Sequence, residues 1–257
     1  MNHKIEIRIA EDPKFAAKHV ALEFAKAIRK NPSIVLGLAT GGTPVEVYRF
    51  LVDYYQKGEI SFEQCTTFNL DEYVGLGPKH EQSYRYFMQQ NLFNHIDVPE
   101  EKTHVPDGIA QNLEKACQDY EAAIKAAGGI DLQLLGIGEN GHIAFNEPGS
   151  DAQGRTEVVE LTENTIAANS RFFGSTDDVP RKAVSLGIGT ILEAKEIILM
   201  ATGESKAKAV ARALEGEPCG DSPASFLQTT NKVIFVLDLA ASKLLSEATC
   251  QAAIQIS

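Results

Sequence analysis

The sequence has few basic residues for its number of acidic ones, few cysteines and no long hydrophobic run. Its 257 residues include 24 Lys and Arg against 35 Asp and Glu, a formal net charge of −11. This balance argues against wholesale binding to nucleic acid or to an anionic membrane. A small anionic substrate would therefore need a locally basic pocket.

Other absences narrow the class of protein further. The 4 cysteines are widely spaced with no CxxC pair, so the sequence predicts neither a disulfide framework nor a structural zinc site. Apolar runs such as Ser33–Ala39 are too short to span a bilayer, and Met1–Pro13 contains no apolar signal-peptide core. We expect a cytoplasmic protein of enzyme size.

Strand-like and helix-like segments alternate along the whole chain. The expected strands are 5–9, 33–39, 66–71, 131–138, 156–161, 196–202 and 232–239. The expected helices are 12–30, a segment from the turn at Pro44 to about Lys57, 84–95, 113–127, 205–214 and 240–249. Buried strands separated by helices are typical of a mostly parallel sheet covered on both faces. The sequence thus predicts an α/β fold.

No repeat, low-complexity tract or Gly/Ser linker interrupts this pattern, so we expect a single domain over 1–257. The segment Asn164–Pro180 is rich in Asn, Ser, Gly and Asp, which predicts a loop or mobile flap. In sheets of this kind ligands bind outside the carboxyl ends of the strands. Three of the turns that follow strands contain residues suited to chemistry.

The first is the turn at 40–44, with the sequence TGGTP. Gly41 and Gly42 let backbone N–H groups face a ligand, and a helix N-terminus adds positive potential, which suits a phosphate. Thr43 is expected to be the N-cap, with Pro44 in the first helical turn. An ordinary capped strand-to-helix turn is the alternative. It is not a Walker A loop, since no Gly-Lys-Ser/Thr follows.

The second is the pair Asp71 and Glu72, at the end of the strand expected at 66–71. A partly desolvated carboxylate there could act as a general base, because burial would raise its pKa. Side chains alternate along a strand, so only one of the pair is expected to face a pocket. The alternative is a surface pair that opens a loop.

The third is the loop at 136–142, which matches GxGxxG through Gly136, Gly138 and Gly141. A dinucleotide site needs a helix that begins in this loop, but Pro148 soon interrupts the chain, so we predict no such site.

His142 lies in the same loop, with Asn140 and Glu147 nearby. A carboxylate and an amide can hold an imidazole in one tautomer, which allows it to shuttle a proton. A lone histidine in a polar loop is the alternative. The other histidines form no cluster and no metal-ligand spacing appears, so we predict no metal site.

Two basic residues could supply the field that an anion requires. Arg171 lies in the expected flap, and Lys206 lies one turn into the helix expected at 205–214, behind Gly203. Arginine binds phosphate with its planar fork, and lysine adds a point charge. Each residue alone is equally consistent with ordinary surface charge.

Taken together, four segments resemble the glucosamine-6-phosphate deaminase family. They are LGLATGGTP (36–44), TFNLDEYVG (67–75), GIGENGHIAFNEP (136–148) and ANSRFF (168–173). They occur in the family's order, and weaker similarity extends over nearly the whole chain. The wider superfamily includes 6-phosphogluconolactonase, but the segment NGHIAFNEP (140–148) favours the deaminase.

The resemblance implies a three-layer, Rossmann-like, doubly wound fold. It also implies conversion of glucosamine 6-phosphate and water to fructose 6-phosphate and ammonia, by ring opening, aldose–ketose isomerisation and deamination without a cofactor. Asp71 would move a proton between C2 and C1. His142 would assist ring opening, oriented by Glu147 and Asn140. The substrate and its phosphate would be bound by Thr40, Gly41, Gly42, Thr43, Gly138, Arg171 and Lys206, under a lid at 162–181.

Two departures from the family pattern matter. Asn140 stands where some members carry Asp, and an amide cannot offset an imidazolium charge. The resemblance implies that members activated by N-acetylglucosamine 6-phosphate carry basic residues at the positions where this chain has Glu157 and Val159. We therefore expect no such activation.

Two other functions stay open: a non-catalytic sugar-phosphate sensor, and a lactonase or isomerase acting on another phosphosugar. A homo-oligomer is compatible with the sequence, which determines neither the oligomeric state nor the preferred amino-sugar epimer.

Overall fold

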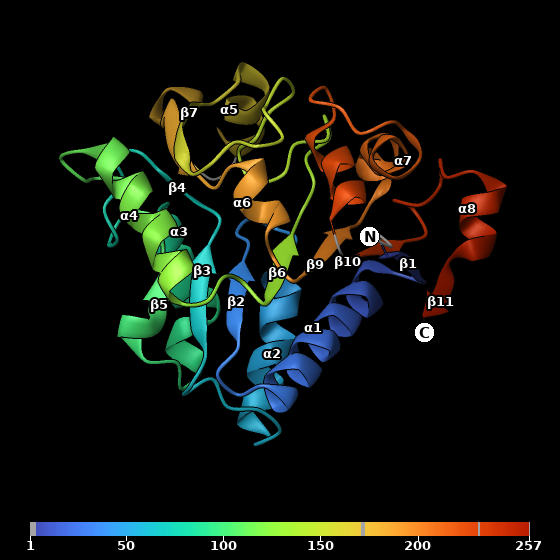
Figure 1. Cartoon of the computed structure of the whole chain (residues 1–257), viewed down its shortest axis with the longest axis horizontal. Coiled ribbons are helices and arrows are strands. Elements are labelled where there is room, and N and C mark those ends of the chain that lie inside the picture. The colour runs from blue at the N-terminus through green and yellow to red at the C-terminus, as the bar shows by residue number, and fades with distance from the viewer. Residues whose placement is uncertain (1–3, 171–172, 231, 257) are drawn as a thin grey trace.

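The centre of the protein is an eight-stranded sheet in the order β11-β1-β10-β9-β6-β2-β3-β5 (Figure 1). The structure is a computed structural model and describes residues 4–170, 173–230 and 232–256. All neighbouring strands of this sheet are parallel. The strands are β1 (Lys4–Ala10), β2 (Val35–Leu38), β3 (Thr66–Asn69), β5 (Thr103–His104), β6 (Leu132–Leu135), β9 (Glu196–Ala201), β10 (Lys232–Asp238) and β11 (Ile254–Ile256).

Helices cover both faces of this sheet, which confirms the predicted α/β fold class. The chain runs outward through α1 (Pro13–Lys30), α2 (Val45–Gln56) and α3 (Tyr84–Asn91), and returns through α4 (Leu113–Ala126), α6 (Ile188–Leu192), α7 (Ala207–Glu215) and α8 (Glu247–Ala252). Crossovers between parallel strands are right-handed, so a change in direction puts the later helices on the opposite face. Accordingly α1 packs on α2 and α2 on α3. None of the described helices is long and apolar enough to cross a membrane.

Helix α1 shows how the local pattern produces an element. The Asp12 side chain accepts the backbone N–H of Phe15 at 2.8 Å and caps the helix, with a proline in its first turn. Val20, Phe24 and Ile28 recur at a spacing of four residues and are buried. This spacing forms one apolar face, which packs against the sheet.

A second, antiparallel sheet of three strands lies at the carboxyl end of the first. Its order is β4 (Asp71–Tyr73), β8 (Lys182–Ser185) and β7 (Glu157–Glu160). Its own hydrophobic core, which we call the small core, comprises Tyr73, Phe145, Leu161, Ile166, Val179 and Ala183. Helix α5 (Glu163–Asn169) lies beside β7, at the top of the molecule in Figure 1. The site described below lies between the two sheets.

The strand expected at 66–71 is instead divided between the sheets at Leu70. The Leu70 N–H donates to the carbonyl of Leu38 on β2, while the Leu70 carbonyl accepts the N–H of Leu186 beyond β8. The chain therefore changes sheets at this residue, and Asp71 begins the second one. The strand expected at 156–161 also belongs to the antiparallel sheet.

The helix expected at 240–249 is wrong for most of its length. Residues 239–244 form turns, in which the Asp238 side chain accepts the Ala241 N–H at 2.7 Å. Helix α8 begins only after Ser246, whose hydroxyl accepts the Thr249 N–H. The Asp238 carboxylate, at the end of β10, thus stabilises a tight turn at the place where the first turn of a helix was expected.

Smaller differences concern the ends of elements and the expected flap. The strand expected at 131–138 ends at Leu135, and α3 gives way to a 3₁₀ turn at Phe93–His95. The expected loop at 164–180 contains most of α5, capped by Thr162, and a 3₁₀ turn at Thr176–Asp178. Strands β5, β8 and β11 and helix α6 were not expected from the sequence. They are too short to show a clear period.

Candidate functional site

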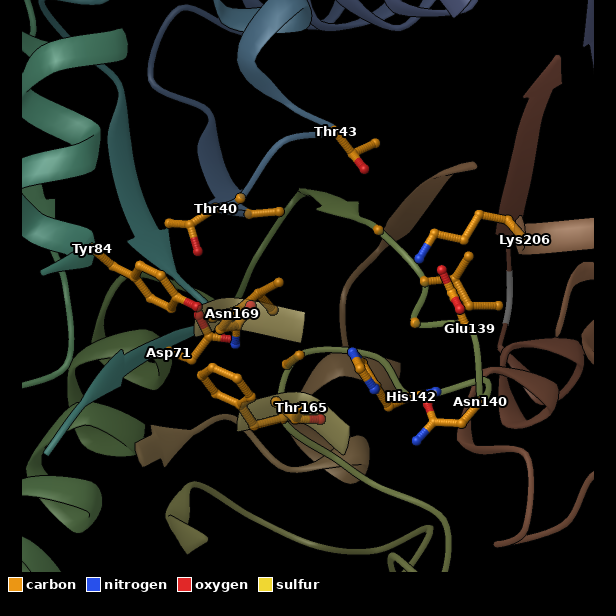
Figure 2. Close-up of a pocket in the computed structure, with 18 residues that line it drawn as sticks. Thr40, Thr43, Asp71, Tyr84, Glu139, Asn140, His142, Thr165, Asn169 and Lys206 are labelled. Carbon is orange, nitrogen blue, oxygen red and sulfur yellow. Dashed lines mark hydrogen bonds between the residues drawn. The ribbon is translucent and has the colours of Figure 1, made fainter. Parts of the chain in front are cut away.

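The order of the strands reverses between β2 and β6, at the middle of the main sheet. The chain leaves β2 toward β3 and leaves β6 toward β9, so the two following turns diverge and open a crevice. A cavity of about 640 Å³ occupies this place. Figure 2 shows Asp71 and Tyr84 on one side of it, Lys206 on the other, and His142 between them.

The turn after β2 forms part of the cavity wall. Thr40, Gly41 and Thr43 line the cavity, and Gly42 lies in the same turn without lining it. Gly41 has φ +92°, a left-handed conformation that favours glycine. The expected cap at Thr43 is wrong, because α2 begins after Pro44, and in the described part of the chain no side chain caps it. The first N–H groups of α2 therefore remain available to a ligand.

The adjacent carboxyl groups at the start of β4 point in different directions. Asp71 lines the cavity and is 6% exposed. The Glu72 carboxylate instead accepts backbone N–H groups from Tyr73, Tyr84 and Arg85, at 2.8, 2.9 and 2.9 Å. It thereby satisfies the N-terminus of α3. The prediction that one member of the pair faces the pocket is confirmed.

Burial changes the acidity of both groups. Burial and the neighbouring Glu72 carboxyl raise the pKa of Asp71 to about 8, although a hydrogen bond with Thr40 opposes the rise. Burial likewise raises the pKa of Glu72 to about 7 against the effect of its three backbone hydrogen bonds. A carboxyl group whose pKa lies near neutrality can both take and return a proton, so Asp71 is a candidate general base.

Several cavity residues were missed by sequence reasoning: Tyr84, Glu139, Thr165 and Asn169. Tyr84 comes from the first residue of α3, and its side chain lies beside Asp71 in Figure 2. Its hydroxyl donates to the Tyr73 hydroxyl at 3.3 Å, and it also shares a hydrogen bond with Thr40. A helix start was predicted at 84, but no local pattern indicates that the tyrosine meets a carboxyl group from β4.

His142 lies beside the carboxylate of Glu147, with 3.6 Å between Nδ1 and Oε2. The side chain of Asn140 donates to the same Oε2 at 2.6 Å, and its Oδ1 accepts the backbone N–H of His142 at 3.2 Å. The expectation that the Asn140 amide contacts the imidazole itself is therefore wrong. The amide holds the carboxylate and the loop backbone.

Gly138 lies directly against the His142 ring. A Cβ at this position would come within 2.3–2.5 Å of three ring atoms, so the close approach requires glycine. The Gly138 N–H also donates to the His142 carbonyl at 2.9 Å. No helix begins within 136–148, as expected for a GxGxxG match that is not a dinucleotide site.

Lys206 lines the cavity from the 3₁₀ turn Glu204–Lys206, before α7 begins rather than one turn inside it. The preceding Gly203 donates its N–H to both carboxylate oxygens of Asp238, at 3.0 Å each. Asp238 is 3% exposed at the end of β10. This buried carboxylate therefore anchors the turn that carries Lys206.

Arg171, the other expected cation, lies outside the described residues. Asn169, two positions earlier, lines the cavity from the end of α5. Among the described residues no group of His, Cys, Asp and Glu is arranged to hold a metal ion. The cavity thus combines groups suited to proton transfer at one end with a lysine and a helix N-terminus at the other.

A family model described as glucosamine-6-phosphate isomerases/6-phosphogluconolactonase matches residues 11–236. The chain belongs to this family. A relative named glucosamine-6-phosphate deaminase, from Rhodopirellula baltica, is 56% identical over 243 residues, covering 95% of this chain and 97% of the relative. A relative of the same name from Clostridium perfringens is 52% identical over 229 residues, covering 89% and 95%. These matches confirm the resemblance carried by the four sequence segments.

Two solved structures have a fold similar to that of this chain. A monomeric glucosamine-6-phosphate deaminase matches with a TM-score of 0.91 at 44% identity, covering 93% of this chain and 99% of that chain. A 6-phosphogluconolactonase from Trypanosoma cruzi matches with a TM-score of 0.75 at 22% identity, covering 96% and 98%. The second likeness concerns the fold alone.

Proposed function

We propose that this chain converts glucosamine 6-phosphate and water to fructose 6-phosphate and ammonia. The observation that carries the proposal is the shared cavity, in which Asp71 and His142 face the same space as Lys206 and the turn after β2. Relatives more than half identical over most of this chain bear the name of that activity. Asp71, Asn140, His142 and Glu147 would perform or support the proton transfers.

The phosphate would bind at the end of the cavity formed by Lys206 and the turn that precedes α2. Lysine supplies a full positive charge, and the uncapped N-terminus of α2 supplies N–H donors. Gly41, Gly42 and Thr43 would contribute their backbone or hydroxyl groups, with Gly138 along the wall and Arg171 from the expected lid. Binding at this end would orient C1 and C2 toward Asp71.

Ring opening would use the imidazole of His142. A neutral ring nitrogen accepts the proton of the anomeric hydroxyl, and the imidazolium returns a proton to the ring oxygen as the C1–O5 bond breaks. The Glu147 carboxylate, 3.6 Å from Nδ1, would stabilise the charged intermediate state. Asn140 would keep that carboxylate in place.

Isomerisation would use Asp71. The carboxylate removes the C2 proton, the electron pair forms a C1=C2 double bond, and O1 is protonated. Return of the proton to C1 leaves an imine at C2, which water attacks, and ammonia departs as the ketone forms. A raised pKa makes Asp71 basic enough for the first step, while its burial excludes competing water.

A stoichiometric assay separates this proposal from its alternatives. With glucosamine 6-phosphate as substrate, we expect equal amounts of ammonia and fructose 6-phosphate. Binding without ammonia release would instead indicate a sugar-phosphate sensor. Faster turnover of 6-phosphogluconolactone or of an epimeric amino sugar phosphate would indicate another member of the wider group.

We further propose that N-acetylglucosamine 6-phosphate does not activate the enzyme. Glu157 is exposed on β7, where its negative charge would repel an anionic effector. The rate at subsaturating substrate should be unchanged when this compound is added. A rate that rises with its concentration would contradict the proposal.

A further inference from the structure

Thr40 and Asp71 lie side by side beyond the carboxyl ends of two neighbouring strands. Strands β2 and β3 are parallel with Leu38 paired to Asn69, and each of the two residues follows the end of its strand by two positions. The hydrogen bond from the Leu70 N–H to the Leu38 carbonyl continues this register past the strands. The strand register thus brings a threonine hydroxyl to the proposed base.

The backbone that carries Thr40 is tied to the larger hydrophobic core. The hydroxyl of Tyr48, on α2, donates to the carbonyl of Ala39, the residue before Thr40. Tyr48 and Ala39 are both buried members of that core. The Thr40 side chain itself lines the cavity, and Figure 2 shows it directed toward Asp71 and Tyr84. A well-anchored backbone therefore presents this hydroxyl at the proton-transfer end of the cavity.

The Thr40 hydroxyl has two hydrogen-bond partners, Asp71 and Tyr84. It has one proton, so it can donate fully to only one of them at a time. The ionised Asp71 carboxylate is the stronger acceptor, because charge-assisted hydrogen bonds are roughly twice as strong as neutral ones. Tyr84 donates its own proton to Tyr73 at 3.3 Å, so its oxygen can accept from Thr40 when Asp71 becomes protonated. The Thr40 hydroxyl therefore has a partner in both protonation states of Asp71.

Thr40 is also the group that favours the ionised form of Asp71. Burial and the Glu72 carboxyl both raise the pKa of Asp71, and among the described residues only the hydrogen bond with Thr40 lowers it. A hydrogen bond donated to one carboxylate oxygen makes that oxygen the weaker base, so a proton is taken by the other oxygen. The same hydrogen bond limits rotation of the carboxylate. The hydroxyl therefore selects which oxygen of Asp71 is presented to a substrate.

We propose that Thr40 is a positioning residue for the base Asp71 rather than a ligand of the phosphate. The inference rests on the proposed function, in which Asp71 moves a proton from C2 to C1. Thr40 holds one carboxylate oxygen and leaves the other free to take the C2 proton.

Thr43, three residues further along the same turn, lies on the side of β6 instead. Its hydroxyl is 4.0 Å from a Cβ built on Gly136, the residue that follows β6. Thr43 lines the same cavity and is only partly buried, as is Thr40. The two threonines of this turn therefore have different roles, one toward Asp71 and one toward the phosphate.

The direct test separates kcat from KM for ammonia release in variants of the two threonines. Thr40→Val keeps the shape of the side chain but removes the hydroxyl, so kcat should fall about 10–100-fold while KM changes less than about 3-fold. Thr43→Val is the matched control from the same turn, and there the loss should appear in KM, which should rise about 3–10-fold. A raised KM with an unchanged kcat in Thr40→Val would overturn the proposal, because it would assign the hydroxyl to the phosphate.

Thr40→Ser tests whether the hydroxyl, rather than the shape of the side chain, is responsible. Serine retains the donor, so kcat in this variant should lie within about 3-fold of the parent value. A loss of kcat in Thr40→Ser as large as that in Thr40→Val would contradict the proposal, because it would show that packing of the threonine methyl group matters instead.

A double-mutant comparison covers the case in which valine disturbs the fold. In an Asp71→Asn background, Thr40→Val should lower the residual kcat no further, because the carboxylate through which Thr40 acts is absent. A further loss of the same size would show that valine acts independently of Asp71 and would overturn the inference.

Failure of the inference and failure of the proposed function appear in different proteins. Ammonia release by the parent together with an unchanged kcat in Thr40→Val would overturn the inference alone. A parent protein that releases no ammonia from glucosamine 6-phosphate would reject the proposed function, and the inference with it.

Discussion

The two walls of the cavity are built on different cores. One wall consists of the turns that follow β2, β3 and β6. These strands contribute to the larger hydrophobic core, which we call the main core and which includes Leu36, Leu134 and Phe235. The other wall is α5, whose buried Ile166 belongs to the small core. An element held by few buried contacts opens at a lower free energy than one held by many. We therefore expect the second wall to open more readily than the first, which carries the proposed proton-transfer groups.

Asp71 shows how a residue of the second sheet gains the rigidity of the first. It begins β4, but its neighbour Leu70 is hydrogen-bonded to Leu38 of β2. The carboxyl group is therefore positioned within one residue of the main sheet. Thr165, in contrast, is linked to the proposed catalytic groups by its hydrogen bond to Glu147.

The largest expected effect follows from replacing Asp71, the proposed general base. In Asp71→Asn, kcat should fall about 10²–10⁴-fold because the amide cannot accept the C2 proton, while KM should change little because the phosphate contacts remain. Steady-state ammonia release measures both constants. Glu139→Gln, an acid-to-amide change at an exposed residue of the same cavity, is the matched control and should leave kcat within a few-fold. Retained activity in Asp71→Asn would remove it from the mechanism.

The second prediction compares the two cores directly with matched truncations. Ile198 on β9 and Ile166 on α5 are both fully buried. Ile198→Ala should lower the free energy of unfolding by about 2–5 kcal/mol. Ile166→Ala should mainly accelerate amide hydrogen exchange within α5, with a smaller change in global stability. Urea unfolding and hydrogen exchange distinguish the two effects, and equal global losses would contradict the idea of a separately movable wall.

The third prediction concerns the anion end of the cavity. Lys206→Ala should raise KM about 10–100-fold, since a charge-assisted hydrogen bond to phosphate contributes on the order of 1.5–3 kcal/mol. Asp238→Asn should raise KM only a few-fold, because it loosens the turn at Gly203 without removing the cation. Steady-state kinetics of both variants provide the check. A larger effect from Asp238→Asn than from Lys206→Ala would reject this assignment.

The smallest expected effect is on stability as a function of pH. The pKa of Asp71 is raised from 3.8 to about 8 on folding, so between these values the folded state binds more protons than the unfolded state. Its contribution to stability is therefore present below about pH 4 and is lost as pH rises through about 8. Asp71→Asn should gain stability relative to the parent as pH rises from 5 to 8.5, measured by urea unfolding.

Glu72 remains in that variant and keeps part of the pH dependence. Burial raises its pKa to about 7, so its contribution also declines with rising pH. The slope of stability against pH should therefore be reduced in Asp71→Asn, without becoming zero. Identical slopes for the parent and the variant would show that Asp71 ionises in the folded state as it does in the unfolded chain.

Local sequence patterns were sufficient to predict most strands of the main sheet. The apolar strand before the glycines at 41 and 42, and the capped pattern of α1, depend on residues close in sequence, so their periods are visible without coordinates. The same holds for the alternation that turns Asp71 and Glu72 in different directions. The four family-like segments also lie in continuous stretches of sequence.

Other features were decided by contacts between distant segments. Leu70 leaves one sheet for another because β8, more than 100 residues later, offers the pairing. Tyr84 meets Asp71, and Thr165 meets Glu147, only after α3 and α5 have packed. Thr43 does not cap α2, although its residue type favours that position.

By itself, the sequence determined most strands and helices of the main sheet, the family, and which side chains can transfer protons or bind an anion, because residue type and short-range periodicity carry that information. Only the tertiary structure decided which of these groups face one cavity, how far Glu147 lies from His142, and which wall rests on the smaller core. Those properties depend on the packing of segments that share no local pattern, where a change of one residue in register or one turn in a helix redirects a side chain.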